Sequence, residues 1–124
     1  MESLWQSLGG AASSWYQAKL FLEHSVTVSS DALHVMAGPL VQLVAALLLR
    51  RPISSFAPWL VLAACTILNE TVDLTVERWP EIAMQLGESA KDLALTMLLP
   101  TLLLVAARLR PDLFRRGSGA RRRR

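Results

Sequence analysis

The chain has few charged residues and almost no cysteine. Of its 124 residues, 19% are charged, against 52% that are hydrophobic. A soluble domain carries about 25% charged residues, so the composition favours a membrane protein. The single cysteine, Cys65, excludes an internal disulfide and lies inside an apolar run, where we expect it to act as a small buried hydrophobe.

Sequence motifs of common enzyme classes are also missing. The chain has no G-x-S-x-G elbow, no Gly-rich phosphate loop, no strand-like alternation and no internal repeat. Cys65 has no neighbouring histidine in sequence, which makes it a poor candidate nucleophile. We therefore assign no catalytic residue, and we expect a non-enzymatic role rather than an enzyme.

The first 28 residues lack the basic start and the long apolar core of a signal peptide. Residues 3–24 place apolar side chains at spacings of three and four, which predicts a helix. Trp5, Trp15 and Tyr16 favour a position at the level of the lipid headgroups. We expect an amphipathic interfacial helix, broken into two pieces by Gly9 and Gly10. The alternative is a short helix packed on a partner.

Three apolar stretches follow, at about 32–49, 53–74 and 89–107. A helix needs roughly twenty residues to cross the hydrocarbon core of a bilayer. The sequence therefore predicts an all-α membrane protein, in which residues 29–107 form a domain of three transmembrane helices. Pro39, Pro58 and Pro100 lie inside these stretches and predict kinks, while Pro52 suits a first helical turn.

The charges are distributed very unevenly along the chain. Ten of the thirteen basic residues lie in the Arg50-Arg51 pair and in residues 108–124, which contain only one acid, Asp112. Basic residues concentrate on the cytoplasmic side of membrane proteins. We therefore expect a multi-pass protein of the plasma (inner) membrane, with the N-terminus outside and residues 108–124 forming a disordered, cytoplasmic polybasic tail.

The arginines of this tail are candidates for binding anionic lipid headgroups at the cytoplasmic face. They are Arg115, Arg116, Arg121, Arg122, Arg123 and Arg124. Nucleic acid is a less favoured partner, because the tail has no interleaved aromatic residues and the chain shows no nucleic-acid-binding motif.

Polar residues gather at the predicted outer ends of all three helices, where ionisable groups within a membrane mark candidate functional sites. If the helices run antiparallel, these ends lie at the same depth. The predicted polar cluster comprises Asp31, His34, Thr66, Glu70, Asp73, Asp92 and Thr96.

The order of these residues resembles the VanZ-like family of small integral membrane proteins. The resemblance covers about residues 30–105 and rests on Asp31-Ala-Leu-His34, on the later Glu70, and on Asp92-Leu-Ala-Leu-Thr96. Members of that family carry an Asp-x-x-His, a Glu and an Asp in this order between membrane helices. The resemblance implies a polar cluster between helices, and one family member is associated with low-level resistance to glycopeptide antibiotics.

Three interpretations of the cluster remain open. Asp31, His34, Glu70 and Asp92 could form a divalent-cation or catalytic site, since imidazole suits Zn or Fe and carboxylates suit Mg, Ca or Mn. They could instead form a polar lock between helices, in an accessory or scaffold subunit that assembles with other membrane proteins. His34 could also bind a pigment or haem, although no CxxCH motif is present. The sequence does not identify the metal or the cofactor.

Overall fold

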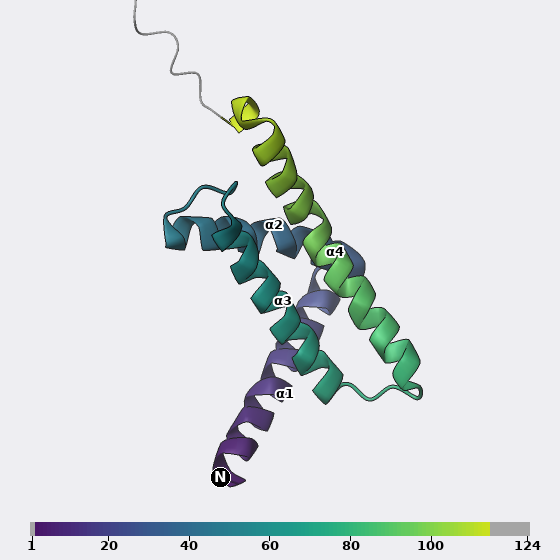
Figure 1. The fold of residues 1–124 in the computed structure, drawn as a ribbon. Helices are drawn as coiled ribbons and strands as arrows, with labels where there is room; N and C mark the ends of the chain where they lie inside the picture. The colour runs from purple at the N-terminus through teal and green to yellow at the C-terminus, as the bar shows by residue number, and fades with distance from the viewer. Residues whose placement is uncertain (1, 115–124) are drawn as a thin grey trace, which may run out of the picture.

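The computed structural model describes residues 2–114, which form four α-helices and a short 3-10 helix (Figure 1). The prediction of an all-α chain is confirmed, and three of the helices are long and apolar enough to cross a membrane. The elements are α1 (Glu2–Ser25), α2 (Ser30–Leu49), α3 (Phe56–Val76), α4 (Ile82–Leu109) and η1 (Pro111–Phe114). The six tail arginines expected to bind lipid lie outside the described residues.

The N-terminal segment forms one helix, not two. Gly9 and Gly10 lie within α1 and have no other side chain close to them. The expected break was wrong because glycine costs only about 1 kcal/mol per helical residue, and good helix formers continue the helix beyond the pair. Figure 1 shows α1 running from the N-terminus towards the bundle of the other three helices.

The connection between α2 and α3 is longer than expected. Arg50 adopts a left-handed backbone conformation, and the N–H of Arg51 donates to the Ala46 carbonyl at 3.0 Å, which closes the end of α2. Helix α3 then begins at Phe56 instead of 53, because the Ser55 side chain caps it by accepting a hydrogen bond from Ala57 N. Pro58 consequently lies in the first turn of α3, where its missing N–H costs little.

Helix α4 begins at Ile82, well before the expected start at 89. Residues 75–88 were expected to connect the second and third membrane helices, yet residues 82–88 are helical. Gln85 helps to fix the short connection, because its side-chain nitrogen donates to the Glu77 carbonyl at 3.1 Å. Polar residues at the end of a membrane helix can remain helical where they leave the hydrocarbon core. At 28 residues, α4 is about 42 Å long.

Helices α2, α3 and α4 all pack against one another, and α1 packs mainly on α3. The core between them is small: Leu62, Pro58, Pro100 and Gln42 are its largest fully buried side chains. In Figure 1, α2 crosses behind α4. Gly38 is buried at this contact, against Thr96 and Pro100 of α4. Small residues allow close packing of this kind between membrane helices, whose other faces contact lipid.

Candidate functional site

His34, Glu70 and Asp92 meet between the three bundle helices. One ligand-type atom from each side chain lies within 4.8 Å of the other two. His34 comes from the second turn of α2, Glu70 from the last third of α3, and Asp92 from the middle of α4. We call these three residues the cation cluster. The sequence placed all three in one polar cluster, and the structure brings them together.

The hydrogen bonds of Thr96 assign a hydrogen to one nitrogen of the His34 ring. The Thr96 hydroxyl donates its only hydrogen to the Asp92 carbonyl at 2.8 Å, so it can only accept from His34 Nδ1, which lies 3.0 Å away. Nδ1 therefore carries a hydrogen. The other ring nitrogen, Nε2, lies 3.4 Å from Asp92 Oδ2. Either the ring is a charged imidazolium paired with Asp92, or Nε2 presents a lone pair to the carboxylates.

Glu70 is buried, with 7% of its surface exposed. Its Oε1 accepts a hydrogen bond from Asn69 Nδ2 at 3.2 Å, and among the described residues it makes no ion pair. A buried carboxylate without an opposite charge is costly and requires a proton or a cation. Glu70 is thus the least compensated member of the cation cluster.

The other predicted members of the polar cluster have different partners. Asp31 is exposed and pairs with Lys91 at 3.1 Å; Lys91 also contacts Glu88. Asp31 is therefore separate from the cation cluster. The Thr66 hydroxyl donates to the Leu62 carbonyl at 2.9 Å within its own helix. The Thr96 hydroxyl contacts two members of the cluster, the His34 ring and the Asp92 backbone carbonyl.

Asp73 serves to attach α1. Its Oδ2 forms an ion pair with Lys19 and accepts a hydrogen bond from Asn69 Nδ2 at 3.1 Å. Trp15 of α1 donates to Asn69 Oδ1 at 3.1 Å. The role of Lys19 was not predicted from the sequence. Lys19 is the only lysine or arginine before Arg50, and this isolated position could have marked it as a partner for an acid.

Two titratable side chains of α1 lie apart from the cation cluster. Partial burial of Tyr16, together with the nearby Glu77 carboxylate, raises the pKa of its phenol above the usual value. His24, the second histidine of the chain, contacts the Leu20 carbonyl of its own helix through Nδ1 at 3.0 Å.

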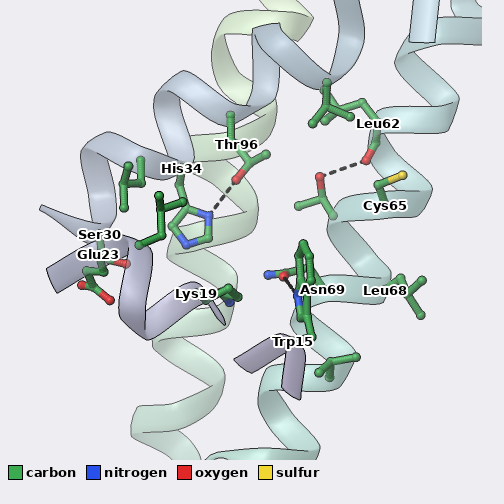
Figure 2. A pocket seen from close by; sticks show the side chains of 16 residues that line it. Trp15, Lys19, Glu23, Ser30, His34, Leu62, Cys65, Leu68, Asn69 and Thr96 are labelled. Carbon is green, nitrogen blue, oxygen red and sulfur yellow. Dashed lines mark hydrogen bonds between the residues drawn. The ribbon is translucent and has the colours of Figure 1, made fainter. Parts of the chain in front are cut away.

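A groove with a volume of about 620 Å³ lies beside the cation cluster. Figure 2 shows its lining side chains, with His34 bonded to Thr96 on one side and Cys65 and Leu68 of α3 on the other. Cys65 is exposed in this groove, so the expectation that it would be buried was wrong. Cys65 is one of the residues of α3 that line the groove.

Gln42 is a second polar group that sequence analysis did not single out. Its side chain is fully buried, and neither Nε2 nor Oε1 has a hydrogen-bond partner among the described residues. It lies on the same face of α2 as Gly38 and Ala45. That face packs inside the bundle.

Comparison with known protein families, with curated proteins and with solved structures finds no match to this chain.

Proposed function

We propose that this chain is a multi-pass protein of the plasma (inner) membrane that binds a divalent cation at His34, Glu70 and Asp92. The observation that carries the proposal is the convergence of three ligand-type atoms, from three different helices, within 4.8 Å. Two ligands of one metal at about 2.1 Å are about 3.4–4.2 Å apart. Binding would therefore need only small movements of these side chains.

The surroundings of His34 also support a metal ligand. A metal-bound histidine almost always donates its second ring N–H to an acceptor, which fixes the orientation of the ring. Thr96 provides this acceptor at Nδ1, so Nε2 is left directed at the cluster. One imidazole with two carboxylates suits Zn²⁺ or Mn²⁺.

The distribution of charges around the cluster also supports a bound cation. Lys19 pairs with Asp73, and Lys91 pairs with Asp31 and Glu88, so neither lysine neutralises Glu70. Within the cluster, two carboxylates face a single histidine. A divalent cation would compensate this excess of negative charge at a depth where ionisable groups are expensive.

A structural role is the second candidate, and the 3.4 Å contact of His34 Nε2 with Asp92 favours it. In that case a charged His34 holds α2 against α4, as a polar lock in an accessory or scaffold subunit of a larger membrane assembly. The VanZ-like resemblance is compatible with both candidates. We further propose that α1 lies amphipathically at the outer interface, and that the polybasic tail binds anionic lipid in the cytoplasm.

The test is a titration of the purified protein in detergent with Zn²⁺, Mn²⁺, Mg²⁺ and Ca²⁺, read by thermal unfolding. A cation that binds only the folded state stabilises it, by about 2.7 kcal/mol at one hundred times its dissociation constant. We expect Zn²⁺ or Mn²⁺ to stabilise the wild type, and Glu70→Gln and His34→Ala to abolish the effect. Asp31→Asn is the matched control and should keep it.

The polar lock predicts the opposite pattern. No cation would stabilise the protein, and His34→Ala would cost about 1–3 kcal/mol by leaving the half-buried Asp92 carboxylate without its partner. The double change His34→Leu with Asp92→Leu, which removes both partners of the 3.4 Å contact, would then restore most of that stability. This result would rule out the cation site.

A further inference from the structure

The groove beside the cation cluster opens between α1, α2 and α3. Its volume of about 620 Å³ falls within the roughly 300–1,000 Å³ typical of small-molecule sites. His34 and Thr96 line the groove, and His34 also belongs to the cation cluster. The groove therefore borders the cluster at His34, and a molecule lying in the groove could contact a cation bound there.

The lining of the groove is mostly apolar, with a few polar groups. Leu33, Val41 and Leu62 are among the apolar residues that form its walls, while Lys19 and Asn69 contribute polar groups. In Figure 2, Lys19, Asn69 and Trp15 gather on one side of the groove, away from Leu62. A ligand that fits this pattern has a long apolar part and a polar end.

The positions of His34 and Glu70 along their helices match the depth of a lipid headgroup. His34 lies one turn from the start of α2, and Glu70 lies less than two turns from the end of α3. At 1.5 Å per residue, both are within about 10 Å of the ends of their helices. The polar end of the groove is thus close to the edge of the hydrocarbon core.

Charge determines which headgroup fits. Glu23 lines the groove, and Asp73, Glu70 and Asp92 lie close by, so acids outnumber Lys19 and His34 at the polar end. This environment repels a bare anion. A divalent cation held by three protein ligands would offset two of these negative charges and would keep a coordination position open for another oxygen.

We propose that the groove binds one membrane phospholipid, with an acyl chain along its apolar walls and a phosphate oxygen on the cation held by His34, Glu70 and Asp92. This inference rests on the proposed cation site. It adds the class of ligand that the site binds, and it assigns the groove and the cluster to a single ligand.

The experiment uses the full chain in detergent with phosphatidic acid, in the presence and absence of Mn²⁺. Native mass spectrometry counts retained lipid, and the rate at which N-ethylmaleimide alkylates Cys65, the only cysteine, reports occupation of the groove. We expect Mn²⁺ to raise the apparent lipid affinity by about 5- to 150-fold, the range typical of coupled ligands. Lipid and Mn²⁺ together should slow alkylation more than either alone.

Two variants of α2 test whether the lipid lies in the groove. Ala37→Phe places a ring in the groove and should abolish lipid retention, while stabilisation by Mn²⁺ remains. Leu47→Phe is the matched control: Leu47 is 69% exposed, lies outside the groove and should leave both measurements unchanged. Lipid retention by Ala37→Phe equal to that of the wild type would overturn the proposal.

Further measurements distinguish failure of the phospholipid inference from failure of the cation site. If Mn²⁺ stabilises the protein but diacylglycerol is retained as well as phosphatidic acid, the cation site stands and the phospholipid inference is wrong. If inorganic phosphate with Mn²⁺ slows alkylation as much as the lipid does, the ligand is free phosphate and the inference is again overturned. If Mn²⁺ neither binds nor affects lipid retention, both proposals fail.

Discussion

Gly38 packs directly against the backbone carbonyl of Thr96. A β-carbon added to Gly38 would lie 2.0 Å from that oxygen and 3.1 Å from a ring carbon of Pro100. Pro100, four residues after Thr96, has no N–H to donate to the Thr96 carbonyl, so this carbonyl lacks its usual helical partner at the contact with α2. The close approach also places Thr96 within hydrogen-bond reach of His34, one turn before Gly38.

Replacing Gly38 tests this contact. Gly38→Ala should destabilise the protein by about 1–3 kcal/mol, because the new methyl group meets rigid backbone and overpacks the interface. Gly87→Ala, in the same bundle but with nothing near its β-carbon, is the control and should stabilise by up to about 1 kcal/mol. Reversible unfolding in mixed detergent measures both. Equal effects of the two substitutions would contradict the close contact between α2 and α4.

Replacing the buried amide of Gln42 should stabilise the protein, in contrast to the replacement of Gly38. Because neither of its polar atoms has a hydrogen-bond partner among the described residues, the side chain bears a desolvation cost of about 1–3 kcal/mol. Gln42→Leu has nearly the same volume and should raise the free energy of unfolding by about 1 kcal/mol or more. A measured loss of stability would show that the amide makes a favourable interaction.

Lys19 is predicted to hold α1 on the bundle. Lys19→Met leaves the buried Asp73 without its cation and should cost about 1–3 kcal/mol, with faster proteolysis in the connection at 26–29. Adding Asp73→Asn should recover much of the loss. Lys91→Met removes a lysine from an exposed pair and should cost much less, because surface ion pairs contribute little to stability. If the Lys91 change were the more costly of the two, α1 would not depend on Lys19.

Orientation in the membrane is predicted by the arginines. A reporter fused after Arg124 should be active only in the cytoplasm, and one inserted at Glu81, between α3 and α4, only outside, because basic residues remain on the cytoplasmic side. Replacing Arg50 and Arg51 with Gln should increase the fraction of inverted molecules. The reverse labelling pattern in the wild type would place the cation cluster at the cytoplasmic face.

The apolar runs were sufficient to predict three long helices, because length and hydropathy alone determine whether a segment can span a bilayer. They were not sufficient for the start of α4, because residues 82–88 were expected to belong to the connection but are helical. The meeting of His34 with Asp92 followed from antiparallel helices whose polar ends share a depth. The pairing of Lys19 with Asp73 could not be predicted in this way, since it depends on the tertiary position of α1. The sequence also did not show that Asp31 lies apart from the cation cluster, because residues one turn apart can face different neighbours.

The three ligands of the cation cluster come from three successive helices, and this has a consequence for biogenesis. Chains are synthesised from the N-terminus, so His34 and Glu70 emerge from the ribosome before Asp92. While only the hairpin of α2 and α3 has inserted, the cluster lacks its third side chain. The site is completed when α4 packs against α2, so its assembly reports that the last membrane segment has inserted in the correct register.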